Sequence, residues 1–253
     1  MPERLSSSSG NSFATEPSTW DSIALGAPVE VLHKLAIGNL ETFDSEAKQA
    51  IGQLSAEGVR LVTTRIASER LVEIDKLQEL GFHFVEMTIS PSLTHFVPEG
   101  EGSYFEVHYA TSFEIERIAG VAFEGFNVSR YHNDPKVSNE MANLRFRNWV
   151  YNAVSSTDQR VLAVVDEADE LMAFFIYSQD GNNSYWHLTA IAKNFRGKGL
   201  ARKIWRSVMN FQMNQGVTAF ETTISAGNLP VLNLYPKLGF VLGKPQVSLH
   251  LHI

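Results

Sequence analysis

The sequence predicts a mixed α/β fold (α+β) in two successive domains, built on a twisted sheet that contains parallel and antiparallel strands. Segments with the two-residue periodicity of strands alternate along the chain with amphipathic helical segments. In the second half, three strands follow one another through short turns, and helix, strand, helix and strand come after them. The chain has 253 residues, of which 44% are hydrophobic and 19% charged, and this composition excludes collagen, coiled coil and wholesale disorder.

The first part of the chain predicts a tail and a smaller α/β domain. Residues 1–18 are rich in Ser, Pro and Asn, which predicts a disordered tail. The domain is expected from residue 19 to about residue 100, with strands at 29–37, 59–66 and 82–89 and helices at 45–57 and 69–80. Asp44 or Ser45 is a plausible N-cap of the first helix. Residues 91–102, with two Pro and two Gly, are the best linker candidate.

The second domain is expected over residues 101–253. Its strands are predicted at 104–111, 161–165, 171–178, 185–192, 217–225 and 247–252, and its helices at 113–126, 137–153, 198–214 and 229–238. The acidic turn 166–170 joins two of these strands as a hairpin.

An internal echo links the two parts. Gly58 and Gly81 bracket one strand–helix pair, and Gly216 and Gly239, the same distance apart in the sequence, bracket another. Two explanations stay open: chance recurrence of a common unit, or two related half-domains.

Charge and cysteine content exclude several kinds of function. The net charge is −7 without a basic run, so we expect no nucleic-acid or membrane partner. Cysteine is absent, which excludes disulfides, thiolate metal sites and cysteine nucleophiles. The longest apolar run, Leu171–Tyr177, is too short to span a bilayer, and the N-terminus lacks the apolar stretch of a secretion signal. We therefore expect a cytoplasmic protein.

The most specific segment is residues 188–201, in which a strand runs into a helix. Its glycines allow the backbone to turn tightly, and the first turn of the helix offers N–H groups without intrahelical partners. With the added charge of Arg196 and Lys198, this segment suits a pyrophosphate. The alternative is a glycine-rich turn that only starts a helix.

These residues resemble the GNAT superfamily of N-acyltransferases. Arg196, Gly199 and Ala201 fit its R-x-x-G-x-G/A motif, and the segment from Asn228 to Phe240 is similar to its second signature, N-x-x-(A/V)-x-x-x-Y-x-x-x-G-F. The resemblance implies a GNAT fold and acetyl-CoA as co-substrate. It implies that the backbone of residues 189–191 pairs with the pantetheine arm like an added strand. The full set of expected cofactor-binding residues is Thr189, Ala190, Ile191, Arg196, Gly197, Lys198, Gly199, Leu200, Ala201, Asn228 and Tyr235.

Two residues are candidates for proton transfer. By the resemblance, Tyr235 lies near the thioester sulfur, and its phenol keeps its proton at neutral pH and can give it to the departing thiolate. The alternative for Tyr235 is a core residue with its hydroxyl at the rim. By two-residue alternation, His187 shares a strand face with Tyr185 and Thr189, and its imidazole can serve as the base. A structural hydrogen-bond donor is the alternative for His187.

The acceptor is expected to involve residues before the cofactor core. Residues 129–135 and Trp149 gather polar, aromatic and basic groups around a turn, and the alternative is a capped helix with a solvated approach loop. This segment, with Trp20-Asp21-Ser22, is similar to the TDP-fucosamine acetyltransferase group, in which a truncated GNAT-like domain precedes the catalytic one. This chain departs from the group at residues 23–25. The candidate substrate-binding residues are Arg130, Tyr131, His132 and Trp149.

The sequence thus predicts transfer of an acetyl group from acetyl-CoA to a primary amine, with a nucleotide-linked (TDP) amino sugar as the favoured acceptor and a monomer or homodimer as the assembly. The alternatives are another small amine (an antibiotic, polyamine or amino acid) and a non-catalytic acyl-CoA sensor. His250 and His252 have the spacing of a chelating pair, but no third ligand is evident. A structural role is therefore favoured for both, and no metal is expected.

Overall fold

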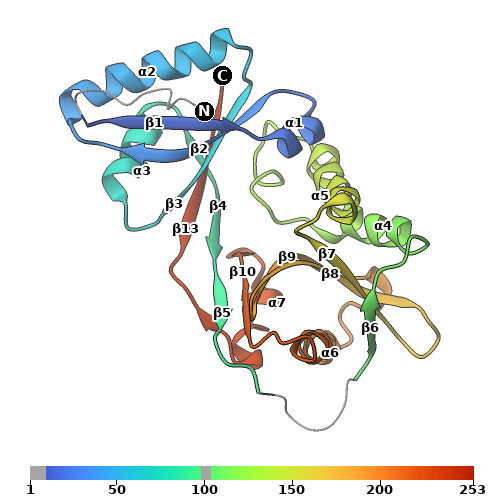
Figure 1. Cartoon of the computed structure of the whole chain (residues 1–253). Helices are drawn as coiled ribbons and strands as arrows, with labels where there is room; N and C mark the ends of the chain where they lie inside the picture. Colours follow the sequence, from blue (N-terminus) through green and yellow to red (C-terminus); the bar gives the residue numbers. More distant parts are fainter. Residues whose placement is uncertain (1–9, 98–103) are drawn as a thin grey trace. The chain divides into compact units, whose positions relative to one another are not determined.

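The computed structural model describes residues 10–97 and 104–253, which form two compact units (Figure 1). The first unit comprises the chain up to Thr88, Ser129–Ala142 and Lys244–Ile253, and the second comprises Ile89–Val128 and Asn143–Gly243. This division differs from the expected boundary near residue 100. The end of the chain and residues 129–142 belong to the first unit, because they pair with or pack on its sheet.

The first unit is built on a sheet of mixed direction. Its strands follow the spatial order β1 (Ser12–Pro17), β2 (Val29–Ala36), β3 (Leu61–Ala67), β13 (Gln246–His252) and β4 (His83–Ile89). β2 and β3 are parallel, and β13 lies antiparallel between β3 and β4.

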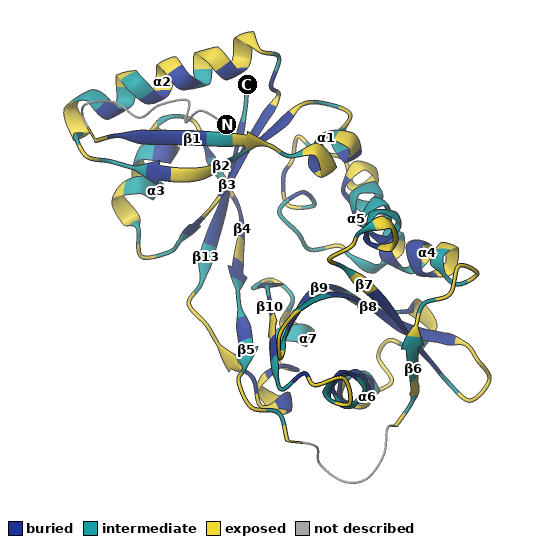
Figure 2. Cartoon of the chain, viewed as in Figure 1, coloured by how far each residue is buried: buried dark blue, intermediate teal, exposed yellow. Residues whose placement is uncertain are grey.

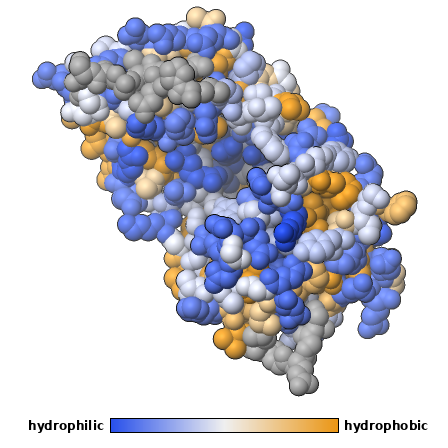
Figure 3. Space-filling model, viewed as in Figure 1, coloured by the Kyte–Doolittle hydropathy of each residue, from blue (hydrophilic) through white to orange (hydrophobic). Residues whose placement is uncertain are grey.

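Helices α2 (Leu40–Ala56) and α3 (Leu71–Glu79) supply the core on one face of this sheet. The short helix α1 (Thr19–Leu25) packs through Leu25 in a separate cluster with Leu61 and Tyr131. On α2, Phe43, Ala47, Ala50 and Leu54 are buried at helical spacing, and the rest of the helix is largely exposed and hydrophilic (Figures 2 and 3). These side chains pack with Leu249 and other apolar residues of the strands.

The second unit is built on a longer mixed sheet. Its spatial order is β12 (Val241–Leu242), β5 (Pro91–Leu93), β10 (Ala219–Thr222), β9 (Asn183–Ile191), β8 (Leu171–Asp180), β7 (Arg160–Val165) and β6 (Glu106–Tyr109). β10 is parallel to β9, and the other neighbouring strands of this sheet are antiparallel.

Helices cover both faces of that sheet. α6 (Ala201–Met213) packs on the face that carries Phe175 and Trp186. α4 (Ile115–Gly125) and α5 (Asn139–Ser155) pack on the face that carries Phe174 and Ile176. Because both faces are covered, every residue of Leu171–Tyr177 is buried, which explains the uninterrupted apolar run in the sequence.

Each unit also contains a strand from a distant part of the sequence. β13 lies between β3 and β4, and β5 lies between β10 and β12. The repeated strand–helix pair of the sequence lies once in each unit. The four glycines that bracket the two copies (Gly58, Gly81, Gly216 and Gly239) all have positive φ, from 84° to 96°. The two copies therefore share backbone geometry as well as spacing.

Several expected elements differ in the structure. Residues 12–17 form β1, paired with β2, where the sequence predicts a disordered tail, whereas residues 1–9 lie outside the described residues. α2 begins at Leu40 because the Asn39 side chain accepts the Glu41 N–H and caps it. The helix expected at 229–238 is two pieces, α7 (Leu229–Leu232) and a 3-10 turn, η2 (Pro236–Leu238), since Pro236 has no N–H to continue the ladder. Among the described residues, no helix has the length and apolar character of a membrane span.

Candidate active site

Near the end of β9, one of its edges has no strand partner within the described part of the chain. The parallel pairing of β9 with β10 stops at Trp186 opposite Thr222, although β9 continues to Ile191. On the other edge, the Ala192 N–H donates to the Met172 carbonyl at 2.8 Å. Because successive peptide groups of a strand point to opposite edges, the N–H groups of Thr189 and Ile191 point away from β8, toward the open edge. The backbone segment expected to pair with pantetheine is thus open to an added strand.

A β-bulge lies in β9 at His187. Ile176 pairs with Leu188, and the next residue of β8, Tyr177, pairs with Trp186, so His187 is the extra residue. Thr189 pairs with Phe175, whose side chain lies on the α6 face, so Thr189 points to that face too. The expectation that Thr189 shares a face with His187 and Tyr185 is therefore wrong, since it assumes uninterrupted alternation.

His187 lies in an aromatic and polar group on the face of α5. Its ring is 4.9 Å from the Tyr185 ring and 6.3 Å from the Trp149 ring, and its Nε2 is 2.9 Å from Ser178 Oγ. Burial lowers the pKa of His187, so the imidazole stays neutral at pH 7. A neutral imidazole in this position can accept a proton.

Tyr235 lies on the other side of β9, within the core under α6. Its hydroxyl accepts a hydrogen bond from Trp205 Nε1 at 3.3 Å, and the residue is 1% exposed. Burial raises the pKa of Tyr235 to about 12, although hydrogen bonding to Trp205, Thr222 and Thr189 opposes the shift. Thr222 and Trp186 are the last residues paired between β10 and β9, so the phenol lies near the point where these strands separate. It holds its proton throughout the physiological pH range.

The glycine-rich loop leads from β9 into α6. Gly197 and Gly199 both have φ near 73°, and a Cβ added to either would meet no atom within 4 Å. The glycines are therefore required by backbone conformation, and the loop surface is open. No side chain caps α6 at Leu200, which leaves the first N–H groups of the helix for a ligand.

Arg196 connects this loop to a cavity. Its Nε donates to the Ile191 carbonyl at 2.7 Å, and the side chain lines a cavity of about 440 Å³. The other lining residues come from α4, the start of β8 and residues 192–195, and they include the cations Arg117 and Lys193 and the anions Glu124 and Glu170.

The remaining expected site residues have contacts of their own. Asn228 caps α7 by accepting the Val231 N–H. Trp149 donates from Nε1 to Gln159 at 3.1 Å, and the Arg145 guanidinium lies 5.1 Å from its ring.

Residues 130–132 belong to the first unit and not to the unit that carries β9 and α6. Arg130 is paired with Asp21 of the Trp20-Asp21-Ser22 segment at 3.0 Å. Tyr131 is 1% exposed in the core of that unit, and His132 bonds Ser129. An ion pair therefore joins the two sequence segments, residues 20–22 and 129–135, that resemble the TDP-fucosamine acetyltransferase group.

Sequence reasoning missed the bulge at His187 and the contact of Trp205 with Tyr235. The bulge has no local composition signal in β9. Trp205 lies on the apolar stripe of α6, so the sequence predicts only that it is a core residue. Its hydrogen bond to Tyr235 depends on how α6 packs in the fold.

Comparison with known proteins identifies the domain to which this part of the chain is similar. Residues 125–240 match the acetyltransferase (GNAT) family. The chain contains a GNAT acetyltransferase domain. This match spans β9, the glycine-rich loop, α6 and Tyr235, and it confirms the expected enzyme class, an N-acetyltransferase. GNAT enzymes use acetyl-CoA as co-substrate and bind an acceptor for the acetyl group.

Relatives and solved structures extend the similarity beyond the GNAT domain. The dTDP-fucosamine acetyltransferase of Escherichia coli is 22% identical over 88% of this chain and 92% of its own length. The spore coat polysaccharide biosynthesis protein SpsD of Bacillus subtilis is 22% identical over 93% of this chain and 82% of its own.

Two solved structures support the fold class. A tandem GNAT protein from the clavulanic acid biosynthesis pathway has a TM-score of 0.61 at 12% identity, over 90% of this chain and 76% of its own. A GCN5-related N-acetyltransferase from Sphaerobacter thermophilus has a TM-score of 0.65 at 12% identity, over 94% and 75%. The expected GNAT fold is confirmed, and the division into two units is compatible with the tandem GNAT structure.

Proposed function

We propose that this chain transfers the acetyl group of acetyl-CoA to a primary amine of a nucleotide-linked (TDP) amino sugar. The observation that carries the proposal is the open edge of β9 beside Tyr235, which offers N–H groups to an extended arm. The choice of acceptor is supported by the two relatives, one named as a dTDP-fucosamine acetyltransferase and the other as a polysaccharide biosynthesis protein.

The co-substrate would lie along this edge and end on α6. The pantetheine arm would follow residues 187–191, and the diphosphate would meet the uncapped N–H groups at the start of α6. Arg196 and Lys198 would add positive charge, and Asn228, half-exposed at its cap, would add a side-chain hydrogen bond.

The residues divide the proton transfers between the two faces of β9. Acetyl-CoA supplies an activated thioester, which the amine attacks directly because the chain has no cysteine to carry the acetyl group. His187 takes the proton of the attacking amine on one face. Tyr235 gives a proton to the departing sulfur on the other. The N–H groups of Thr189 and Ile191 stabilise the negative charge that develops on the carbonyl oxygen.

The acceptor amine would approach from the side of His187. Tyr185 and Trp149 surround that imidazole and can hold a sugar or base ring. Arg130, Tyr131 and His132 stay predictions for the acceptor, and a diphosphate would have to share Arg130 with Asp21.

Thiol release from acetyl-CoA tests the proposal. The full chain is assayed against a panel that contains TDP-linked amino sugars, free amino sugars, polyamines, amino acids and aminoglycosides. The proposal expects the highest kcat/KM for a TDP-linked amino sugar. Higher turnover of another amine would contradict the acceptor, and binding of acetyl-CoA without turnover of any amine would favour the sensor.

A further inference from the structure

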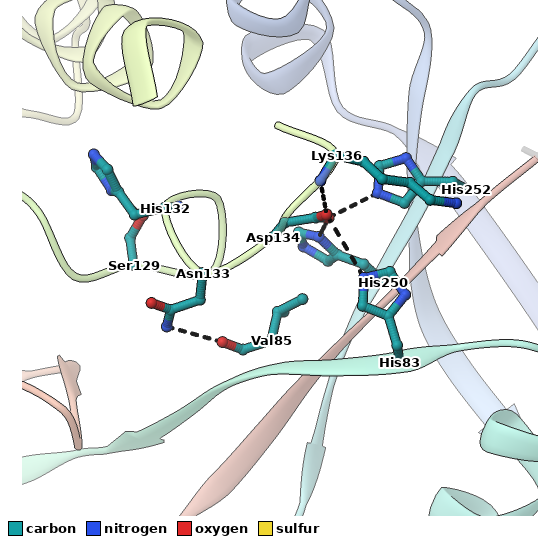
Figure 4. A network of polar contacts seen from close by, with 9 residues as sticks. All are labelled: His83, Val85, Ser129, His132, Asn133, Asp134, Lys136, His250 and His252. Atoms are coloured by element: carbon teal, nitrogen blue, oxygen red, sulfur yellow. Dashed lines mark hydrogen bonds and ion pairs between the residues drawn. The ribbon is translucent and has the colours of Figure 1, made fainter. Parts of the chain in front are cut away.

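A histidine–aspartate cluster lies in the first unit and takes no part in the proposed acetyl transfer. His83 on β4 and His250 on β13 are paired directly across the sheet, and His252 follows two residues later on β13. All three therefore point to one face, opposite the face on which Leu249 and Leu251 pack with α2 and α3. Asp134 reaches this face from the segment 129–142 (Figure 4).

The carboxylate of Asp134 is surrounded by imidazole nitrogens. Its Oδ2 is 2.6 Å from His250 Nδ1 and 2.7 Å from His252 Nε2, and its Oδ1 is 3.7 Å from His83 Nε2. The Lys136 backbone N–H donates to Oδ1 at 2.9 Å. The Asp134 side chain is fully buried, and buried carboxylates in proteins are paired with cations or coordinate metals.

Two nitrogens in this cluster, His83 Nε2 and His250 Nε2, are inaccessible to solvent and have no hydrogen-bond partner among the described residues. His83 Nε2 is the one that faces the Asp134 carboxylate. The rings of His83 and His252 are stacked, with centroids 5.7 Å apart and planes 13° from parallel, so their Nε2 atoms reach the same region. Ligand atoms of His83, Asp134 and His252 all lie within 4.8 Å of one another.

We propose that His83, Asp134 and His252 form a zinc site. Two imidazoles and a carboxylate are ligands that Zn²⁺ favours, whereas Mg²⁺ prefers oxygen ligands alone. Ligands of one tetrahedral zinc ion lie roughly 3.3 Å apart, so the present separations require only small side-chain shifts.

His250 and solvent complete the site. His250 donates Nδ1–H to the same carboxylate and holds it from behind, as outer partners of metal ligands do. His83 Nε2 itself is covered, but the side chains of His83 and His252 are 37% and 19% exposed, so the side-chain shifts that bring the ligands together would let water reach the fourth position. A bound ion would join residue 134 to β4 and β13, three segments distant in sequence, and would stabilise the first unit.

Zinc titration of the full chain after dialysis against a chelator tests this site. We expect calorimetry to give one zinc ion per chain, elemental analysis after gel filtration to confirm that ratio, and the melting temperature to rise with zinc concentration. His83→Ala is the main variant, because His83 is partly exposed and its loss spares the buried core. His33→Ala on β2, an exposed histidine of the same unit, is the matched control.

The zinc affinities of the variants show whether these residues bind the ion. Loss of a residue that only hydrogen-bonds a metal ligand weakens metal binding by about tenfold or more. We expect His83→Ala and His252→Ala, which remove ligands themselves, to weaken zinc binding by more than about tenfold. His33→Ala should leave zinc binding unchanged. Equal affinity in His83→Ala and the unaltered chain, no zinc binding at all, or equally tight binding of Mg²⁺ would each overturn the proposal. Circular dichroism of each variant verifies that it is folded.

Discussion

Tyr235 is a phenol that keeps its proton in the core, with its hydroxyl bonded to Trp205. Tyr235→Phe keeps the ring and removes only this hydroxyl. If the phenol protonates the sulfur, we expect kcat to fall by about 10²–10⁴, with little change in the affinity for acetyl-CoA. Loss of the acceptor for the Trp205 N–H should lower the free energy of unfolding by about 1–3 kcal/mol. Steady-state kinetics at saturating substrates and denaturant unfolding measure the two effects separately.

Tyr177→Phe is the matched control for this substitution. Tyr177 is fully buried in the same core cluster, and burial raises its pKa to about 12 as well, yet it lies on β8 and has no proposed part in the reaction. We expect it to change stability and leave kcat near that of the unaltered chain. A near-normal kcat in Tyr235→Phe would contradict a role for Tyr235 in proton transfer and would show that it is only a core residue.

Protonation of His187 should cause the loss of acetyltransferase activity at low pH, the acidic limb of the pH profile. Its pKa is lowered by burial, so the neutral, proton-accepting form persists below the ordinary value of about 6.5. Activity should therefore fall only as the pH drops through this depressed pKa. His187→Gln should remove that limb and lower kcat/KM by about 10²–10⁴. An unchanged limb in the variant would assign it to another group.

The bulge marks where residue-level prediction failed. Alternation places His187 beside Tyr185 correctly, and their rings are 4.9 Å apart. The same alternation gives Thr189 the wrong face, because one extra residue at His187 reverses the order of the faces beyond it. A bulge depends on pairing with β8, which local periodicity does not contain.

At the scale of elements, the loop between β9 and α6 depends on its two glycines. Gly199→Ala places a Cβ on a residue with φ of 73°, which costs about 1–2 kcal/mol in the present conformation. We expect the loop to relax away from this geometry and the KM for acetyl-CoA to rise by about tenfold or more, since the diphosphate contacts depend on it. The KM for the amine should change much less.

Gly181→Ala is the control for this variant. Gly181 also has positive φ, 56°, and an open environment, but it lies in the turn between β8 and β9. The strain is comparable, so a loss of stability should appear in both variants. A rise in the KM for acetyl-CoA in Gly181→Ala equal to that in Gly199→Ala would show a general effect of strain.

Element prediction succeeded where local signals dominate. β9 and α6 carry clear periodicities; α6 lies within its expected range, and β9 begins two residues before its expected start. The start of α2 was misplaced because Asn39 outcompetes Asp44 and Ser45 as its cap. β1 was missed because a polar Ser- and Thr-rich segment becomes a strand only through pairing with β2.

At the scale of the whole molecule, each unit depends on a strand from the other half of the sequence. The fragment 101–253 lacks β5, which lies between β10 and β12, and the fragment 1–100 lacks β13, which lies between β3 and β4. We expect neither fragment alone to unfold cooperatively, and we expect co-expression of both to restore the fold. Thermal unfolding followed by circular dichroism measures this. A cooperative transition in isolated 101–253 would contradict it.

The repeated strand–helix pair in the sequence is consistent with two units, but it does not predict how the strands of each sheet are connected. The shared spacing left chance recurrence and two related half-domains open, and the four positive φ angles agree with related half-domains. Which strand completes which sheet could not be predicted, because pairing partners so distant in sequence leave no mark on local periodicity.

Binding of the co-substrate at the start of α6 is the central claim, and calorimetric titration tests it most directly. Acetyl-CoA and S-acetylpantetheine, which lacks the diphosphate, are titrated in parallel into the full chain. We predict saturable binding of one acetyl-CoA per chain, at least about tenfold tighter than binding of the truncated compound, because the uncapped amides and Arg196 would contact the diphosphate. Equal affinities for the two compounds, or no saturable heat with acetyl-CoA, would contradict the account.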